Sequence, residues 1–318
     1  MPERALRRLP APRVPPPRLG GQTTSGRLAL VASRLTPTND ALLEALRVAG
    51  VDAVWLPAGE LAGAASPPGY TLLGRIDVQP GLDGVEPAVW DLRRAERRGT
   101  PVLNRSETLL AAHDKLTTAL RLREAELPHP RTALIAGADE PSRLRWPFVV
   151  KPRFGSWGRD VVLCERREDL RRCLAEFDRR PWFRRHGALV QELVPPLGHD
   201  LRLIVAGGRV VGGVRRRCAP GEWRTNVALG ARREPLAEIP PAAGALAQAA
   251  AAALDADLVG VDLLPQADGS YVVLEVNGAA DFTRDYDLSG DMFAAAAARL
   301  RACLGGFGAT RAVQTATA

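Results

Sequence analysis

Two lysines stand alone in a strongly arginine-rich sequence. Of the 43 basic residues in the 318-residue chain, only Lys115 and Lys151 are lysine, and all the others are arginine. Lysine carries a compact point charge on a flexible stem, whereas arginine presents a wide planar fork. A crowded phosphate-binding site favours the compact charge. We therefore predict that each of the two lysines contacts a phosphate oxygen.

A predicted hairpin over 257–278 carries oxygen ligands. Asp268-Gly269 is a favoured two-residue turn, and a tight turn there puts Asp262 directly opposite Glu275. Opposed residues share a face, and Asn277 joins that face two residues further on. The flanking residues are apolar, so the strands are expected to be buried, and opposed buried carboxylates need a positive partner. The pattern predicts one or two Mg ions, or Mn in their place, over the alternative of solvated hairpin residues.

A glycine-bearing loop, RFGSWGRD at 153–160, separates two predicted strands. Gly155 and Gly158 let the backbone approach a ligand and turn its N–H groups toward an anion. Lys151 ends the first strand at the mouth of this loop. The order of residues matches neither a Walker A loop nor a Rossmann fingerprint. Alone, such a loop is most often an ordinary hairpin; beside a metal-binding hairpin it favours a phosphate site.

The predicted elements form two parts, a β-α-β start and a later series of strands and helices. The chain begins as β-α-β, with a strand from Leu28, a helix that Asn39 caps and Gly50 ends, and a second strand over 51–57, which predicts a small parallel sheet. Ser106 is expected to cap a long helix that carries Lys115 and ends near Pro128. Beyond it, alternating apolar patterns predict strands at 131–136, 148–152, 161–165, 188–194, 200–206 and 209–217, and helices at 168–179, 242–254 and 293–304.

Composition limits the class of protein. The chain has 46% apolar and 25% charged residues, a net charge of +7 and a pI of about 9.9. No Lys/Arg block with interleaved aromatic residues appears, so the basic balance indicates a dispersed surface charge and speaks against a nucleic-acid partner.

The cysteines and the apolar runs indicate the cellular compartment. The four cysteines, Cys164, Cys173, Cys218 and Cys303, form no metal-binding or disulfide pattern, which predicts reduced thiols and a cytoplasmic protein. No apolar run reaches the about 18 residues that a membrane helix needs.

The motifs, taken in order, resemble the ATP-grasp superfamily, and most closely its RimK-type amino-acid ligases, over roughly 104–304. The series runs Asp114-Lys115-Leu116-Thr117-Thr118, Lys151 to Gly158, Gln191-Glu192-Leu193-Val194, Gly198 to Arg202, Val210 to Arg217, Gly221 to Asn226, and Glu275-Val276-Asn277-Gly278. Val227-Ala228-Leu229-Gly230 stands where these ligases often have a glycine pair, so the loop beside the acceptor site departs from the pattern.

The resemblance implies a role for each matching position. Lys115 and Lys151 would hold the phosphates of ATP beneath the lid loop that contains Gly155, Ser156 and Gly158. Glu192 and the backbone of Leu193 would read adenine, and Asp200 would lie in the same nucleotide site. Arg224, Thr225 and Asn226 would approach the nucleotide or an acyl phosphate, and Asp262, Glu275 and Asn277 would bind Mg.

The resemblance also implies a reaction. A substrate carboxylate attacks the terminal phosphate of ATP, which gives an acyl phosphate and ADP, and an amine then displaces phosphate. The candidate catalytic cations are Arg202, Arg216, Arg217 and Arg224, because guanidinium binds carboxylate and phosphate in a bidentate manner. The substrates would be a peptide or small-molecule carboxylate and an amino acid such as glutamate.

The implied architecture is α/β with α+β lobes, the ATP-grasp fold. The expected parts are a Pro/Arg-rich disordered tail at 1–26, an α/β lobe at 27–108, a central lobe at 109–187, a C-terminal lobe at 188–304 and a second disordered tail at 305–318. Two alternatives stay open: an ATP-grasp ligase for a dipeptide or a coenzyme acceptor, and a basic nucleic-acid or ribosome-associated module with weak ATP use. By analogy with such families, a homo-oligomer also stays open.

Overall fold

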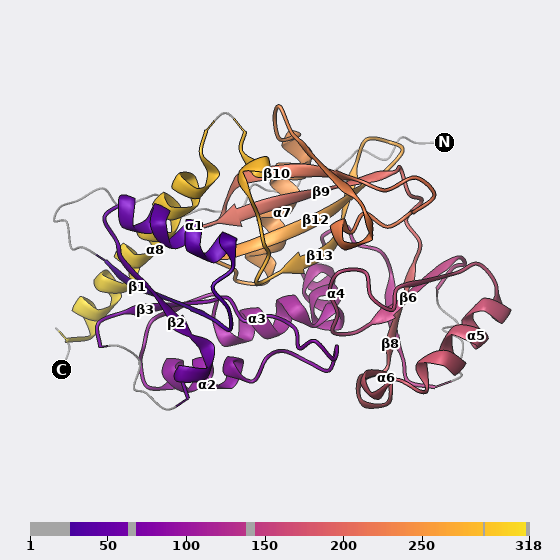
Figure 1. The fold of residues 1–318 in the computed structure, drawn as a ribbon, viewed down its shortest axis with the longest axis horizontal. Coiled ribbons are helices and arrows are strands. Elements are labelled where there is room, and N and C mark those ends of the chain that lie inside the picture. Colours follow the sequence, from indigo (N-terminus) through magenta and orange to yellow (C-terminus); the bar gives the residue numbers. More distant parts are fainter. Residues whose placement is uncertain (1–25, 63–67, 138–143, 289, 316–318) are drawn as a thin grey trace, which may run out of the picture.

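Three lobes surround a common centre in the computed structural model, which describes residues 26–62, 68–137, 144–288 and 290–315 (Figure 1). Residues 1–25 of the expected N-terminal tail lie outside the described residues. No helix among the described residues is both long and apolar enough to cross a membrane. The four cysteines are free thiols, as expected.

The first lobe is a parallel sheet in the strand order β2-β1-β3-β4, which confirms the β-α-β start. Its elements are β1 (Arg27–Ala32), α1 (Pro37–Val48), β2 (Asp52–Pro57), a 3₁₀ turn (Ala58–Glu60), β3 (Thr71–Gly74), α2 (Ala88–Arg97) and β4 (Val102–Leu103). Asn39 does not cap α1, because Thr36 does: its side chain accepts a hydrogen bond from the N–H of Asn39. The side chain of Asn39 is therefore available for another contact.

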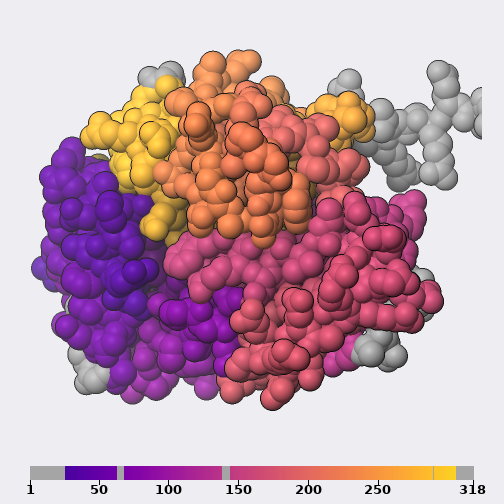
Figure 2. All heavy atoms as spheres, turned by 45° about the vertical axis from the view of Figure 1, so that its right-hand side comes forward, coloured from indigo at the N-terminus to yellow at the C-terminus, as the bar shows by residue number. Residues whose placement is uncertain are grey.

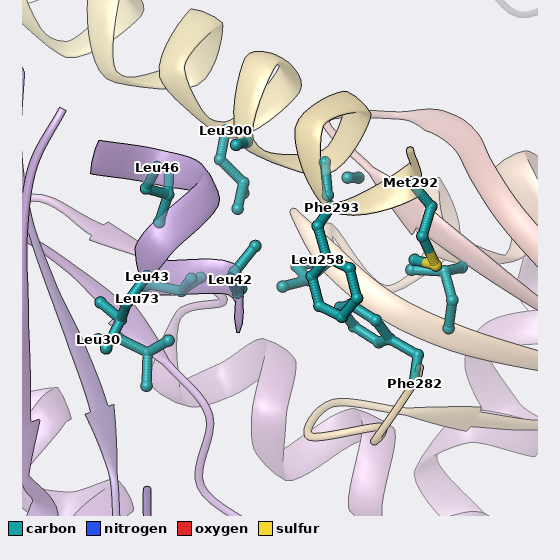
Figure 3. Close-up of a cluster of buried hydrophobic side chains, with 14 of the residues drawn as sticks. Leu30, Leu42, Leu43, Leu46, Leu73, Leu258, Phe282, Met292, Phe293 and Leu300 are labelled. Atoms are coloured by element: carbon teal, nitrogen blue, oxygen red, sulfur yellow. The ribbon is translucent and has the colours of Figure 1, made fainter. Parts of the chain in front are cut away.

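The last helix returns to the first lobe. Helix α8 (Met292–Thr315) packs against α1, and Figure 3 shows Leu300 and Phe293 of α8 facing Leu42 and Leu46 of α1 across a buried apolar cluster. The helix continues past residue 304, so the backbone of the expected C-terminal tail is helical up to Thr315.

The central lobe is an antiparallel sheet in the order β5-β8-β6-β7. Its elements are β5 (Thr132–Ile135), β6 (Phe148–Pro152), β7 (Val162–Cys164), α5 (Arg167–Phe177), α6 (Pro181–His186) and β8 (Ala188–Glu192). Strand β8 pairs with both β5 and β6, so this lobe ends after Glu192 and not at residue 187. One apolar residue of the first lobe, Leu82, is buried in the core of the central lobe.

The C-terminal lobe is a five-stranded antiparallel sheet in the order β11-β10-β9-β12-β13. Its elements are β9 (His199–Ala206), β10 (Arg209–Arg217), a 3₁₀ turn (Val227–Leu229), β11 (Arg232–Pro235), α7 (Pro241–Ala253), β12 (Leu258–Pro265), β13 (Tyr271–Asn277) and a second 3₁₀ turn (Arg284–Tyr286). Small alanine side chains on α7, such as Ala243, Ala247 and Ala250, are fully buried against the sheet.

The helix expected from Ser106 to Pro128 is two helices, α3 (Ser106–His113) and α4 (Lys115–Glu124). They meet at Asp114, whose backbone is extended and whose carboxylate accepts from the N–H of Leu116 at 3.1 Å. An aspartate in this role is a favoured N-cap. The break starts α4 at Lys115 and so fixes the direction in which this lysine leaves the helix. Both helices pack against β13, and α4 also contacts α7 and β5.

The hairpin of β12 and β13 has the expected pairing with an unexpected turn. Asp262 lies directly opposite Glu275, as predicted. The turn, however, is a three-residue loop over 267–269 with Gly269 at a φ of +81°. A bulge at Leu274 then adds one residue on β13 and restores the pairing of the two carboxylates. Two departures from ideal geometry therefore compensate each other.

Asn104 connects the first and the C-terminal lobes. This residue is completely buried, and its side chain donates to the carbonyl of Leu258 at 2.6 Å. Its side-chain oxygen accepts from the N–H groups of Asp257 and Leu258, both at 2.9 Å. An amide side chain satisfies these buried backbone groups because it supplies a donor and an acceptor together.

We predict that Asn104→Ala lowers the free energy of unfolding by about 3 kcal/mol, because it leaves several buried backbone groups without partners. Urea titration followed by far-UV circular dichroism measures this. Gln248→Ala, which removes a part-buried amide from α7, is the matched control and should change stability by less than about 0.5 kcal/mol. Equal effects of the two substitutions would contradict the role of Asn104.

Candidate active site

One cavity of about 820 Å³ lies between the three lobes. Figure 2 shows the first lobe (indigo), the central lobe (magenta to pink) and the C-terminal lobe (orange) meeting on one face of the molecule. Most sequence-predicted site residues line this cavity: Lys115, Lys151, Gly155, Ser156, Gly158, Glu192, Leu193, Arg202, Arg216, Arg224, Thr225, Asn226, Asp262, Glu275 and Asn277. Two do not, Asp200 and Arg217.

A row of charged side chains crosses the C-terminal sheet toward the cavity. Arg216 of β10 lies opposite Asp200 of β9, and Arg202, two residues along β9, lies opposite Asp262 of β12. Asp262 in turn lies opposite Glu275 of β13. Opposed residues, and residues two apart on a strand, share one face of a sheet. The backbone register alone therefore gathers all five charges on one surface.

The charges in this row are paired. Arg202 donates to both carboxylate oxygens of Asp262, at 2.6 and 2.7 Å, and Arg216 reaches the second oxygen at 2.9 Å. Arg216 also pairs with both oxygens of Asp200, which accepts from the Thr225 hydroxyl at 2.5 Å. Burial would raise the pKa of Asp262, but the two guanidinium charges outweigh burial and hold this pKa well below its usual range.

Asp200 and Arg217 have other roles than the expected ones. Asp200 is fully buried beneath Arg216, so it positions this arginine and does not reach the nucleotide site itself. Arg217 points to the opposite face of β10 from Arg216, because neighbouring residues on a strand alternate. There it pairs with the exposed Glu234 at 2.7 Å. The same alternation rule, applied to the sequence, could have separated Arg216 from Arg217.

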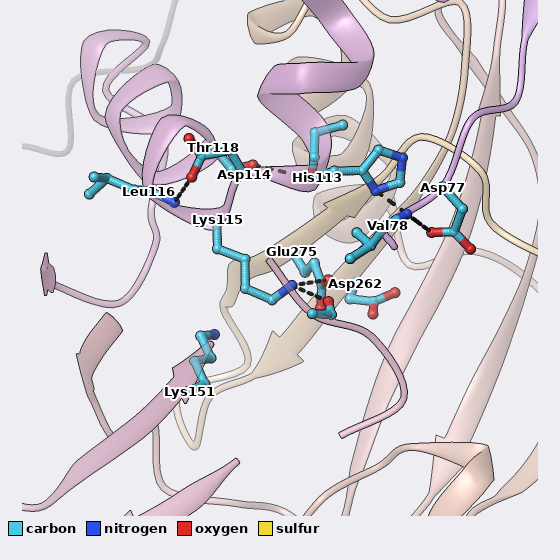
Figure 4. Close-up of polar contacts among 12 residues, drawn as sticks. Asp77, Val78, His113, Asp114, Lys115, Leu116, Thr118, Lys151, Asp262 and Glu275 are labelled. Carbon is cyan, nitrogen blue, oxygen red and sulfur yellow. Dashed lines mark hydrogen bonds and ion pairs between the residues drawn. The ribbon is translucent and has the colours of Figure 1, made fainter. Parts of the chain in front are cut away.

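The two lysines approach the cavity from different lobes. Lys115 extends from α4, and its Nζ lies 2.9 Å from Oε1 of Glu275 and 2.5 Å from the carbonyl of Gly155 (Figure 4). Lys151, on β6, is buried and donates to Gln191 at 2.8 Å. Burial lowers the pKa of Lys151 to about 8; the nearby charge of Lys115 adds to this shift, and Glu275 opposes it.

The glycine-rich loop is held over the cavity by Arg224. Its guanidinium donates to the carbonyls of Gly158 and Val161 and to the carboxylate of Glu222. The hydrogen bond from Arg224 lowers the pKa of Glu222 to about 2. Gly158 has a φ of +72°, and a Cβ there would lie 2.7 Å from Oδ1 of Asn226. Glycine is therefore required where the loop meets Asn226.

The connection after β8 differs in detail from the expectation for the adenine site. The N–H of Leu193 already donates to the carbonyl of Pro147 at 3.0 Å. Glu192 faces Arg131 and accepts from the N–H of Arg145 at 2.9 Å. Within the described ranges, the N–H of Val194 has no acceptor, and Val194 lines the cavity. The backbone donor left for a ligand therefore belongs to Val194 and not to Leu193.

The oxygen-only set of Asp262, Glu275 and Asn277 fits a hard divalent cation. All three side chains line the cavity, and in the part of the chain that the structure describes the buried amide nitrogen of Asn277 has no hydrogen-bond partner. The amide can therefore turn its oxygen toward a cation without breaking a bond. Asp262 uses three of its roughly four acceptor positions for arginines, which leaves Glu275 and Asn277 as the freer ligands. No cluster of three His, Cys, Asp or Glu side chains suited to a metal occurs among the described residues.

The first lobe contributes cavity residues that the sequence did not reveal. They follow the carboxyl ends of β1 and β3: Ser33, Arg34, Thr36, Asn39, Arg75 and Asp77. In an open parallel sheet, ligands bind at this edge, where the strand order changes direction. The order β2-β1-β3-β4 places the change between β1 and β3. The β-α-β pattern could have pointed to this edge, although not to the individual side chains.

A family model for the RimK-like ATP-grasp domain matches residues 106–295. The chain belongs to the RimK-like ATP-grasp family. An alpha-aminoadipate–LysW ligase of Saccharolobus solfataricus is 32% identical over 193 residues, which are 59% of this chain and 69% of that protein. A probable alpha-L-glutamate ligase of Aeromonas salmonicida is 34% identical over 194 residues, 59% and 63% of the respective chains.

Solved structures resemble the chain over most of its length. An ATP-grasp RimK domain protein from Sphaerobacter thermophilus superimposes with a TM-score of 0.64 at 24% identity, over 86% of this chain and 99% of that one. A D-alanine–D-alanine ligase from Bacillus anthracis complexed with ATP gives 0.61 at 15% identity, over 92% and 100%. These confirm the ATP-grasp fold expected from the motifs.

We predict that ATP binding weakens as the pH rises through 8, because Lys151 then loses the charge that a phosphate requires. The apparent Kd for MgATP should rise roughly tenfold per pH unit above 8 and stay flat below 7. Calorimetric titration across pH 6.5–9.5 measures this, and Lys151→Gln should bind weakly without this pH dependence. A flat wild-type profile would contradict the prediction. In the unfolded chain the pKa of Lys151 is near 10.5, so between pH 8 and 10.5 the unfolded chain holds this proton more than the folded protein does. The free energy of unfolding of the ligand-free protein therefore rises as the pH rises from 8 to 10.5.

We predict that Arg216→Met costs about 4 kcal/mol of stability, because it leaves Asp200 buried without its cation. Arg217→Met is the matched control: it removes a solvent-screened ion pair on the neighbouring residue and should cost far less stability than Arg216→Met. Chemical denaturation measures both. Similar small losses would mean that the buried row tolerates an unpaired carboxylate.

Proposed function

We propose that the protein is a Mg-ATP-dependent carboxylate–amine ligase that forms an amide bond through an acyl phosphate. The observation that carries the proposal is the convergence of Lys115, Lys151, Glu275 and Asn277 on one cavity, beneath a glycine loop held by Arg224. Family membership supports this reaction over a nucleic-acid-binding role. The oxygen ligands would hold Mg, which neutralises the charge that spreads over a transferring phosphoryl group.

The cationic side chains bind and orient the nucleotide. Lys151 has no carboxylate partner within hydrogen-bond distance in the described structure, so a phosphate oxygen would supply its missing counter-charge. Lys115 is paired with Glu275, and it can exchange this carboxylate for phosphate once Glu275 has another cation. The N–H of Val194 would read the base. These steps bring two anions, ATP and the substrate carboxylate, into one site despite their repulsion.

The reaction needs no nucleophile from the protein. One carboxylate oxygen of the acid attacks the terminal phosphorus of ATP, and ADP leaves. The amine then attacks the acyl carbon, loses one proton, and inorganic phosphate leaves. Arg202 lines the cavity, and its Nη1 has no acceptor among the described residues, so it can stabilise the developing oxyanion. The Nε and Nη2 atoms of Arg202 hold the side chain against Asp262.

The substrates proposed are an amino acid, such as glutamate, and a peptide or small-molecule carboxylate. Support comes from relatives named as alpha-L-glutamate ligase and alpha-aminoadipate–LysW ligase, and from the similar fold of an ATP-grasp ligase complexed with a precursor peptide. The cavity volume of about 820 Å³ leaves room for ATP and a second substrate together.

The test is a hydroxylamine trap. Purified protein, MgATP and a pool of carboxylates are mixed with hydroxylamine in place of the unknown amine, and hydroxamate is measured with ADP. Wild-type protein should form both products. Glu275→Gln should reduce the rate of hydroxamate formation by at least about 100-fold, while the stability of the ligand-free protein stays unchanged. Glu234→Gln, on the other face of the sheet, is the matched control. Wild-type protein that neither binds MgATP nor forms hydroxamate would refute the ligase proposal.

A further inference from the structure

Arg75 is a buried cation without a close counter-ion at the first-lobe wall of the cavity. Only 2% of its side chain is exposed. Its Nε donates to Oδ1 of Asn39 at 2.6 Å and its Nη2 to the carbonyl of Ala280 at 2.7 Å, so both of its short contacts are to neutral groups. Asp281 is the nearest paired carboxylate at 3.9 Å, and 62% of its side chain is exposed. Burial lowers the pKa of Arg75, and the charges of Asp281 and Asp77 oppose this shift.

A purely structural clamp would not need this charge. The two hydrogen bonds join α1 to the loop after β13, and a neutral amide could make similar ones. A buried charge normally requires a partner of opposite sign. Among the described residues, Nη1 of Arg75 has no acceptor, and Arg75 lines the cavity. Asp281 at 3.9 Å and the ring of Phe282, whose centroid lies 5.8 Å from the guanidinium carbon, offset part of this charge, and the free Nη1 can bind a further anion in the cavity.

The position of Arg75 fits a substrate subsite. It follows β3 at the edge where the strand order of the first sheet changes direction, the usual ligand-binding edge of such sheets. Its partner Ala280 lies on the loop that follows Asn277, and Arg75, Asn277 and Ala280 line the same cavity. The first turn of α1 faces the same region through Thr36 and Asn39, and a helix N-terminus favours an anion.

The surrounding charges limit the kind of anion. Arg34 lines the same wall, and its guanidinium has no hydrogen-bond or ion-pair partner in the described part of the chain. Asp77, Glu86 and Asp281 also line it and would repel a polyphosphate. With Nε and Nη2 already donating to Asn39 and Ala280, the free Nη1 suits one small anion such as a single carboxylate. Acidic neighbours further suit an ammonium group on the same molecule.

We propose that Arg75 and the first turn of α1 form a subsite for a substrate carboxylate that is not itself phosphorylated. This inference rests on the proposed function, because it takes the cavity to hold the ligase substrates. The carboxylate has two sources: the α-carboxylate of the amino acid that donates the amine, or a second carboxylate on the acid substrate. Both use the same chemistry, and Arg75 determines specificity for it.

Direct binding tests the subsite without turnover. The thermal midpoint of the full chain with saturating MgADP is measured with a pool of the common L-amino acids, with a pool of their α-carboxamides, and with glutarate. The amino-acid pool should raise the midpoint and the carboxamides should not; a response to glutarate alone would assign the subsite to the acid substrate. No response to either carboxylate probe would overturn the proposal.

Three variants separate binding from structure. Arg75→Met should abolish the response, and Arg75→Lys, which keeps the charge and loses the fork, should weaken carboxylate affinity by about 10- to 100-fold. Arg94→Gln, on the exposed face of α2, should leave it unchanged. Each variant is first shown to bind MgADP as wild type does. If Arg75→Met only lowers the midpoint and keeps the ligand response, Arg75 is a structural clamp and the proposal is wrong.

The outcome is separable from the proposed function. A protein that binds carboxylates through Arg75 but forms no hydroxamate would keep the subsite and refute the ligase reaction. A protein that forms hydroxamate, and in which Arg75→Met keeps the wild-type thermal response to both carboxylate probes, would keep the ligase and refute the subsite.

Discussion

The salt bridge of Asp262 with Arg202 and Arg216 is the interaction on which the site depends. It joins three adjacent strands, β10, β9 and β12, at the point where β13 adds Glu275. Buried charges cost several kcal/mol each to desolvate, so the row is stable only when every member has a partner. The two arginines and the two aspartates, Asp200 and Asp262, balance each other. Glu275 is the additional negative charge, and Lys115 neutralises it from the first turn of α4.

The lobes are held around this row by contacts that cross the cavity. Leu82 of the first lobe is buried in the core of the central lobe, and Phe154 of the glycine loop packs in turn against the core of the first lobe. Arg185 and His186 of α6 both pair with Asp83, the residue after Leu82. These reciprocal contacts bring the glycine loop and both lysines to the cavity. The first and central lobes are therefore held together by their own contacts and not by the C-terminal sheet alone.

Arginine and lysine divide the work in this protein according to their shapes. Arg153 holds Asp114 with two hydrogen bonds, and Arg224 holds the glycine loop, so the planar forks position other protein groups. The two lysines instead place a single charge in the cavity. Arg75 is unusual among the arginines because it is buried and has no bidentate carboxylate within the described residues.

Much of the site was determined by local patterns in the sequence. The Asp268-Gly269 turn signal and the two-residue period of a strand predicted that Asp262, Glu275 and Asn277 share a face, and the pairing of the two carboxylates is confirmed even though the turn is longer than expected. The scarcity of lysine indicated Lys115 and Lys151, which both line the cavity. Strand period and residue type are local properties, so they are readable without the fold.

Only the tertiary structure decided which side chains reach the cavity from elsewhere. The contact of Arg75 with Ala280 and the pairing of Lys115 with Glu275 depend on strands and loops that are distant in sequence. Such contacts are set by the packing of whole lobes, which places residues more than 100 positions apart in contact, as it does for Asn104 and Leu258. Local periodicity carries no information about these distances, whereas packing determines them.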